Sequence, residues 1–227
     1  MRLVLVGCEY AGKTTLAHGV ATWIERTMGP PIPRGMPPFH DHFTFPDIAH
    51  GGLTDEECEQ VMALSPRLKS MIQNHQILYH HNPSFYGDHD NIMVGFHIEN
   101  AVYGPLYYGY GEDGGGSAIA RNVEGHIMGL ARDTVLVLMK ASPQAIAQRM
   151  RETTHHRGIL KEKDVEHVLM RFEEEYAAST IRYRFVLDTT TTTTEETLEQ
   201  FVEYIQPHLA ESDRTRLLAH RALHSDG

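Results

Sequence analysis

The sequence predicts an α/β fold of three layers, in which a parallel five-stranded sheet lies between helices. Two observations point to it. Short β-branched and apolar runs alternate with helical patterns, and a glycine-bearing loop joins the first run to the first helix. The length of 227 residues suits one well-buried α/β domain and is short for two. We therefore expect one domain over residues 1–209 and a tail or short helix over residues 210–227.

The strands are predicted from the apolar runs. They cover residues 2–6, 92–98, 134–140 and 184–187, with a further strand around residues 38–42. Because helical patterns separate these runs, the strands are expected to lie parallel to one another.

Several helices are predicted from their start signals. Thr54 and Glu57 have the spacing of a capping box, while Ser65 and Ser142 each precede a proline that suits the first helical position. The threonine run over residues 189–194 lies between a strand pattern and a helical one, so it is interpreted as a strand end and an N-cap.

Two further helices are predicted from their apolar faces. Residues 161–179 and 194–209 repeat apolar side chains at helical spacing, which is typical of amphipathic helices packed on a core. The faces carry Val165, Val168, Leu169, Phe172 and Tyr176 in the first helix, and Leu198, Phe201, Val202 and Ile205 in the second.

Three irregular stretches interrupt this alternation. Proline dominates residues 29–38, glycine dominates residues 107–117, and residues 82–91 hold both. Loops of this kind either carry binding groups or merely connect elements, and both interpretations stay open here.

The loop after the first strand has the spacing G-x-x-x-x-G-K-T over residues 7–14. Glycines at both ends allow backbone torsions that a side chain forbids, so successive N–H groups can surround phosphate oxygens at a helix N-terminus. Lys13 is expected to reach the β- and γ-phosphates of ATP, and Thr14 to ligate Mg²⁺. The expected nucleotide contacts are Gly7, Glu9, Tyr10, Ala11, Gly12, Lys13, Thr14 and Thr15.

The composition limits the partners. With 20 Lys and Arg against 30 Asp and Glu, the formal net charge is −10, which argues against a broad surface for duplex nucleic acid or anionic lipid. Only Cys8 and Cys58 are present, so no disulfide framework is expected and a reducing, cytoplasmic compartment is indicated. No apolar run approaches the length of a membrane span, and no signal peptide is expected.

The rest of the sequence must choose among the classes of phosphate-loop protein. A GTPase should carry N-K-x-D after a strand, whereas residues 140–143 read KASP. The sequence D-x-x-G does occur over residues 113–116, but a match inside a glycine-rich run carries little weight. The GTPase interpretation is therefore disfavoured.

The order of motifs resembles the P-loop nucleoside and nucleotide kinases, in particular the thymidylate and deoxynucleoside kinases, over most of residues 1–209. Those enzymes carry an acid, then Arg, then tyrosines after the third strand. Here Glu99 falls on the acid, Asn100 on the Arg, and Tyr103 and Tyr107 keep the aromatic spacing. The stretch ASPQAIAQRMRETTHHRG after the fourth strand looks like the family's Arg-bearing lid, here about residues 149–163.

The resemblance implies a Mg²⁺–ATP-dependent phosphotransferase whose acceptor is a nucleoside or nucleoside monophosphate. Asp41 falls where the family places its catalytic acid, and Glu99 would hold Mg²⁺ or the acceptor. Lid arginines would neutralise the transferring charge and help to exclude water. The expected catalytic residues are Lys13, Asp41, Glu99, Arg149, Arg151 and Arg157, with Thr14 and Glu99 at the metal.

Asn100 leaves the acceptor open, because the family's Arg meets phosphate at this position and a neutral amide cannot do so by charge. Either Arg34 or Arg67 replaces it, or the acceptor carries no phosphate. Aromatic residues on the acceptor side could stack a base or belong to the core: Phe39, Phe43, Phe45, Tyr79, Phe85 and Tyr103. The alternatives are a kinase for a non-nucleotide alcohol or modified base, and a nucleotide-binding regulator. Relatives are often homodimers, so residues 68–81 are either a dimer surface or core.

Overall fold

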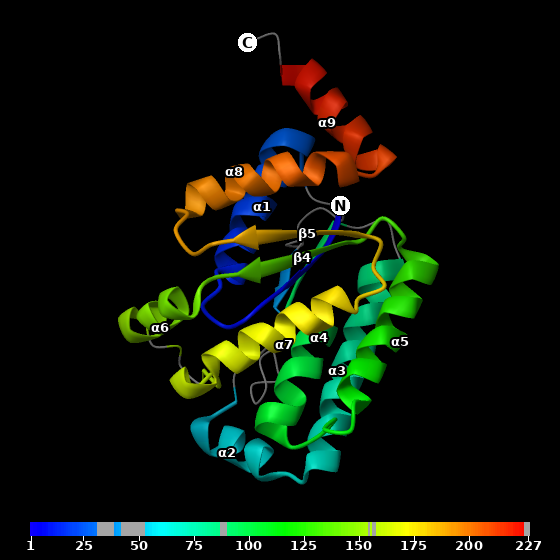
Figure 1. Ribbon diagram of the computed structural model, residues 1–227. Helices are drawn as coiled ribbons and strands as arrows, with labels where there is room; N and C mark the ends of the chain where they lie inside the picture. The colour runs from blue at the N-terminus through cyan, green and yellow to red at the C-terminus, as the bar shows by residue number, and fades with distance from the viewer. Residues whose placement is uncertain (31–38, 42–52, 87–89, 154, 156–157, 225–227) are drawn as a thin grey trace.

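The computed structural model describes residues 1–30, 39–41, 53–86, 90–153, 155 and 158–224; for residues 39–41 and 79–86 it describes the backbone only. Figure 1 shows the arrangement of the elements. In chain order they are β1 (Arg2–Val6), α1 (Lys13–Met28), β2 (Phe39–Asp41), α2 (Asp55–Ala63), α3 (Pro66–Tyr86), β3 (Asn91–Val94), α4 (His97–Tyr103), a π-helical turn (Gly104–Tyr108), α5 (Gly115–Leu130), β4 (Val135–Lys140), α6 (Pro143–Glu152), a 3₁₀ turn (Glu162–Asp164), α7 (Val165–Ala177), β5 (Tyr183–Asp188), α8 (Thr194–Ile205), a second 3₁₀ turn (Gln206–His208) and α9 (Glu211–His224).

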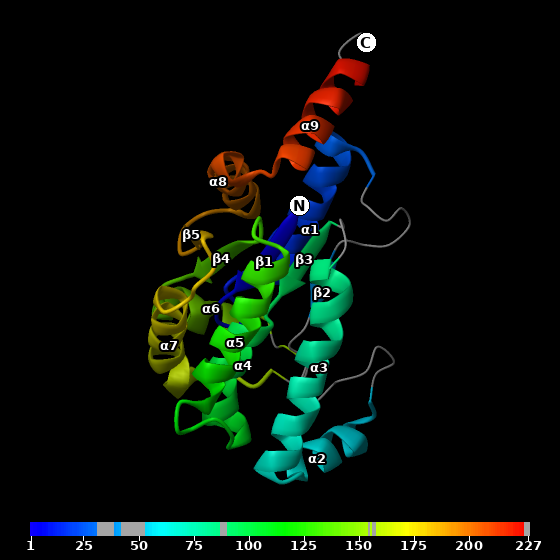
Figure 2. The same cartoon turned by 90° about the vertical axis from the view of Figure 1, so that its right-hand side faces the viewer.

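The strands form a parallel sheet in the order β2-β3-β1-β4-β5. Helices α1 and α8 cover one face, and α4, α5 and α7 cover the other, which gives the three layers (Figures 1 and 2). The predicted α/β class is therefore confirmed. Since β1 lies at the centre, the loop that follows it opens at the middle of the sheet's carboxyl edge, where ligands bind in such folds.

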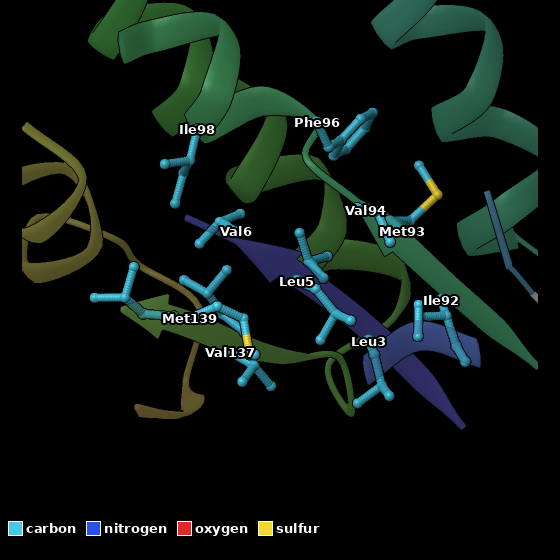
Figure 3. Packing of buried hydrophobic residues seen from close by; sticks show 14 of the residues in the cluster. Leu3, Leu5, Val6, Ile92, Met93, Val94, Phe96, Ile98, Val137 and Met139 are labelled. Carbon is cyan, nitrogen blue, oxygen red and sulfur yellow. The ribbon is translucent and has the colours of Figure 1, made fainter. Parts of the chain in front are cut away.

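The centre of the sheet is entirely apolar. Leu3, Leu5 and Val6 of β1 pack with side chains of β3 and β4 (Figure 3), and all three are fully buried. Ile98 of α4 lies over the end of β1 and is also fully buried. Burial of such a side chain contributes about 1.5–3 kcal/mol. The core thus holds β1 and the start of α4 against each other.

The predicted helix starts are confirmed at their caps. Ser65 accepts a hydrogen bond from the Leu68 amide at 3.4 Å, and α3 begins at Pro66. Thr54 and Glu57 form a complete capping box at α2. Ser142 accepts a hydrogen bond from the Ala145 amide at α6. A second box starts α8, where Thr193 of the threonine run is the N-cap. The predicted faces of α7 and α8 are buried or half-buried on the core, as expected from their spacing.

Three predictions of the local structure were wrong. The third strand ends at Val94, not at Ile98, because Gly95 and Phe96 take positive φ angles of 81° and 87° and turn the chain into α4. Part of the predicted loop 82–91 is helical, since α3 continues to Tyr86. The predicted loop 107–117 includes the start of α5, which opens at Gly115.

The last described element is helix α9, so residues 211–224 of the predicted tail or short helix are helical. Buried ion pairs dock α9 onto the amino edge of the sheet. The Met1 ammonium lies 2.6 Å from Asp90 and 2.9 Å from Asp213 of α9, and Arg216 of α9 donates to both Asp90 oxygens at 2.9 Å. This helix therefore packs on the end of the sheet opposite to the phosphate loop.

Candidate active site

The predicted phosphate loop joins the end of β1 to the start of α1. Gly7 follows the strand so closely that a Cβ on it would lie 2.2 Å from the Met139 carbonyl oxygen. Only glycine fits there, because the obstacle is backbone of the neighbouring strand β4. Gly7 thus serves the packing of the loop on the sheet.

Gly12 serves a different purpose. It is the N-cap of α1 with φ 88°, and no side chain caps the helix. A Cβ on Gly12 would meet no atom of the described residues within 4 Å, so open space faces the first turn of the helix. Thr14 and Thr15 are exposed on that turn. An uncapped helix N-terminus facing open space fits a phosphate group.

Lys13 lies across this loop. Its ammonium donates to the Gly7 carbonyl at 2.7 Å and to the Cys8 carbonyl at 3.0 Å. The same nitrogen lies 3.0 Å from Oε1 of Glu99, whose side chain is only 5% exposed. The cation expected at the phosphates and the carboxylate expected at the metal are therefore neighbours, although they lie 86 positions apart in the sequence.

Glu99 reaches Lys13 from a helix and not from a strand end as predicted. It lies in the first turn of α4, and the positions directly after β3 are Gly95 and Phe96. The acid-then-Arg pair of the resemblance therefore has no counterpart at the strand end. Asn100 is buried beside Glu99. Its Oδ1 accepts a hydrogen bond from the Tyr110 hydroxyl at 2.7 Å, and its Nδ2 has no partner in the described part of the chain.

Glu9 and Tyr10, predicted as nucleotide contacts, turn their side chains toward the segment after α6. The Glu9 carboxylate accepts hydrogen bonds from the amides of Ile159 and Leu160 at 3.2 and 3.4 Å. The Tyr10 ring stacks on His155 with centroids 3.9 Å apart. Both side chains therefore contact the predicted lid.

The three predicted lid arginines have different surroundings. Arg149, still within α6, donates to the Tyr10 carbonyl at 2.9 Å and to the Thr189 hydroxyl at 3.1 Å. Arg151 forms an exposed ion pair with Glu162 at 3.0 Å. Arg157 lies outside the described residues. Arg149 thus supports the phosphate loop from behind, whereas the pair at Arg151 lies at the surface.

Asp41 ends β2, where its backbone pairs with Val94 at the end of β3. The strand therefore brings it to the carboxyl edge of the sheet, the edge that also carries the phosphate loop. Its side chain lies outside the described part. The same holds for Arg34 and for the suggested base-stacking residues, with one exception.

That exception is Tyr103, which is fully buried and is not available for stacking. Its hydroxyl accepts a hydrogen bond from the Glu9 amide at 3.0 Å, and burial raises its pKa well above the usual range. Tyr107 contacts the far end of the predicted lid, because its hydroxyl accepts a hydrogen bond from the Lys161 amide at 3.5 Å and donates to Asp164, just beyond the lid, at 3.2 Å. The two tyrosines of the resemblance thus support the loop and the lid.

Cys8 lies beneath the loop and is fully buried. Burial raises the pKa of its thiol to about 12, although the neighbouring Lys13 ammonium acts in the opposite direction. At neutral pH the thiol therefore stays protonated and adds no charge to the phosphate site.

A buried polar cluster fixes the start of α4, and sequence reasoning missed its central residue, Glu124 of α5. This carboxylate accepts hydrogen bonds from Ser179 and the Thr180 amide at 2.7 Å each, and Nε2 of His97 lies 3.1 Å from it. Burial opposes its ionisation, but the bonds from His97, Thr180 and Ser179 outweigh this and hold the pKa of Glu124 at about 2. Burial lowers the pKa of His97, which is therefore neutral. His97 itself is buried in the first turn of α4.

Among the described residues, no three side chains of His, Cys, Asp or Glu come together as a metal cluster. None of the helices in those ranges has the length and apolar character that crossing a bilayer requires.

The structure is similar in fold to proteins of known structure. No protein-family model matches the sequence, and a search of curated proteins gives no match. The YorR protein of Bacillus subtilis, solved in complex with phosphorylated GDP, matches with a TM-score of 0.60 at 15% identity, over 93% of this chain and 100% of that one. Thymidylate kinase from Ehrlichia chaffeensis matches with a TM-score of 0.56 at 14% identity, over 91% and 98%. Similarity to solved structures at such low sequence identity shows the architecture alone. By this architecture the chain has a P-loop kinase-like fold.

Proposed function

We propose that this protein is a Mg²⁺–ATP-dependent phosphotransferase whose acceptor is a nucleoside or nucleoside monophosphate. The observation that carries the proposal is the 3.0 Å contact between the Lys13 ammonium and the Glu99 carboxylate at the uncapped start of α1. Phosphoryl transfer consists mainly of positioning and charge neutralisation, and these two groups supply opposite charges at one point. A mere phosphate-binding turn has no need of the carboxylate.

The loop would hold the donor nucleotide through its backbone. Amides of the first turn of α1, with Gly12 leaving room for close approach, would bind phosphate oxygens. Lys13 would exchange its bonds to the Gly7 and Cys8 carbonyls for phosphate oxygens while it keeps Glu99 as a neighbour. The exposed Thr14 and the carboxylate of Glu99 would hold Mg²⁺, which when bound neutralises charge on the phosphates.

The acceptor would bind at the carboxyl edge of β2 and β3. Asp41 ends β2 at this edge, and we propose that its carboxylate orients the acceptor hydroxyl or takes its proton. Arg157 would bind the transferring phosphate. The role proposed for Arg151 would require it to leave Glu162, whereas Arg149 would act by supporting the loop at the Tyr10 carbonyl.

The nucleotide class of the acceptor is supported by the resemblance of motif order and by two solved structures, one a thymidylate kinase and the other bound to a phosphorylated guanosine nucleotide. An acceptor that already carries a phosphate would need a cationic side chain of the protein to bind it. Asn100 provides none, and Arg67 at the start of α3 is exposed. We propose that a nucleoside is preferred unless Arg67 or Arg34 serves the phosphate.

The cellular setting proposed is the cytoplasm, in keeping with two cysteines that are both free and buried. A homodimer through α3 is proposed as well. Leu68, Met71 and Leu78 are 45–59% exposed along this helix, which suits an interface more than core.

The test is ADP release from Mg²⁺–ATP, measured alone and then with each nucleoside and each nucleoside monophosphate. Lys13→Ala serves as the blank, because it removes the ammonium and is expected to leave the fold intact. A rise with one acceptor, absent in the variant, supports the kinase and identifies the acceptor class. A steady basal rate that no nucleotide acceptor raises would favour a regulator or an acceptor outside nucleotide chemistry.

A further inference from the structure

Two side chains of the phosphate loop hold the chain that follows α6. Both oxygens of Glu9 accept hydrogen bonds from backbone amides, Oε1 from Ile159 at 3.2 Å and Oε2 from Leu160 at 3.4 Å. Two successive amides on one carboxylate form a charge-assisted contact, which is stronger than a bond between neutral groups.

Tyr10 adds a second contact beside the first. Its ring lies flat on the His155 ring, with 3.9 Å between centroids and 10° between planes, and its hydroxyl accepts from the His155 amide at 3.3 Å. Gly158 fits tightly between these contacts, since a Cβ on it would lie 3.2 Å from the Cβ of His155 and 3.3 Å from Oε2 of Glu9. The described residues of the segment thus pack directly on the loop.

The loop side of this contact is held from behind. The Glu9 amide donates to the buried Tyr103 hydroxyl at 3.0 Å, and the Tyr10 carbonyl accepts from Arg149 at 2.9 Å. Tyr10 also keeps a φ of 65°, which a residue other than glycine adopts only when its surroundings impose it. Because the backbone of Glu9 and Tyr10 is held in this way, their side chains point toward the segment after α6.

We propose that Glu9 and Tyr10 are positioning residues that hold residues 155 and 158–160 closed over the phosphate loop and so keep water from the bound nucleotide. The carboxylate of Glu9 then acts on the protein's own amides and not on ATP. This fits its charge, because a carboxylate aimed at phosphate would be repelled. The effect on water rests on the proposed kinase function, whereas the closure itself does not.

Hydrogen exchange tests the closure without catalysis. The amides of Ile159 and Leu160 are expected to exchange about tenfold faster or more in Glu9→Ala than in the wild type, because their acceptor is lost. Tyr10→Ala is expected to accelerate the His155 amide in the same way. Glu166→Ala is the matched control, since Glu166 is an exposed carboxylate on the nearby helix α7. Unchanged exchange at Ile159 and Leu160 in a folded Glu9→Ala would overturn the proposal.

ADP release without acceptor tests the consequence. Glu9→Ala is expected to raise this acceptor-independent hydrolysis several-fold relative to acceptor-dependent transfer, while Glu166→Ala leaves the ratio unchanged. Faster exchange with an unchanged ratio would overturn the exclusion of water. If the wild type shows no ATP turnover, the kinase proposal fails, and the exchange experiment alone still decides the closure.

Discussion

The ammonium of Lys13 and the carboxylate of Glu99 lie 3.0 Å apart, one at the start of α1 and the other in the first turn of α4. Each helix follows a central strand of the sheet, β1 or β3, and those strands are neighbours. The parallel pairing therefore brings together two helix starts, and with them the opposite charges on which the proposed phosphoryl transfer depends.

Replacement of Glu99 by Gln tests whether its charge is used in catalysis. The amide keeps the shape but removes the negative charge beside Lys13. We expect kcat to fall about 10²-fold and the Mg²⁺ concentration for half-maximal rate to rise. Both follow from ADP release measured over a Mg²⁺ titration. Glu166→Gln, an exposed change of the same type, should leave both unchanged, and equal curves for Glu99→Gln and the wild type would reduce Glu99 to a structural ion pair.

The loop thiol of Cys8 should resist alkylation. Burial raises its pKa from 9.0 to about 12, so its thiolate fraction at pH 8 falls to about 10⁻⁴, where an ordinary thiol has about a tenth. Iodoacetamide at pH 8 should therefore label native Cys8 about 10³-fold more slowly than the protein unfolded in guanidinium. Mass spectrometry of the peptide that carries residue 8 gives both rates. Equal rates would contradict burial of the thiol beneath the loop.

Glu124 should make the protein sensitive to acid. Its pKa is about 2 in the folded state and near the usual 4.5 when unfolded, so between these values the unfolded chain binds more protons. The stability that Glu124 provides is thus complete above about pH 4.5 and is lost as the pH falls toward 2. Denaturant unfolding of the wild type and Glu124→Gln across this range measures it. The wild-type curve should be the steeper one, and parallel curves would exclude the carboxylate as the cause.

Local patterns predicted the parts of the fold that depend on neighbouring residues. The phosphate loop and the caps at Thr54, Ser142 and Thr193 each bring their own partners within a few positions, so spacing alone reveals them. The end of β3 is different. Apolar side chains recur through Ile98, whereas the chain turns at Gly95 and Phe96, and the following His97 contacts Glu124 of a distant helix.

Long-range partners explain what else the sequence did not reveal. The contact of Glu9 with the segment after α6 was not predicted, because the sequence shows only the place of Glu9 in the loop, and its amide partner lies 150 positions away. Helix α5 was not predicted because it opens on two glycines without a side-chain cap and contains two more. Once the sheet is formed, the buried side chains of α5 pack against the core and stabilise this helix, although its glycines disfavour helix formation.

The two glycines of the loop should respond differently to alanine, because one meets protein and the other meets open space. In Gly7→Ala the new Cβ would lie 2.2 Å from the Met139 carbonyl, so the sheet must shift and the protein should lose about 1–3 kcal/mol or unfold. In Gly12→Ala the Cβ meets no described atom within 4 Å, and the cost is the left-handed φ of 88°, about 1–2 kcal/mol.

Nucleotide binding separates the two variants further. Thermal unfolding with and without Mg²⁺–ATP reports binding as a rise in Tm. Gly12→Ala should stay folded yet lose this rise, since the methyl group stands where the backbone must approach a phosphate. Any Gly7→Ala that folds should have the lower Tm of the two without nucleotide. If Gly12→Ala kept the full rise with Mg²⁺–ATP, the phosphate could not lie at the open start of α1, and the assignment of the site would fail.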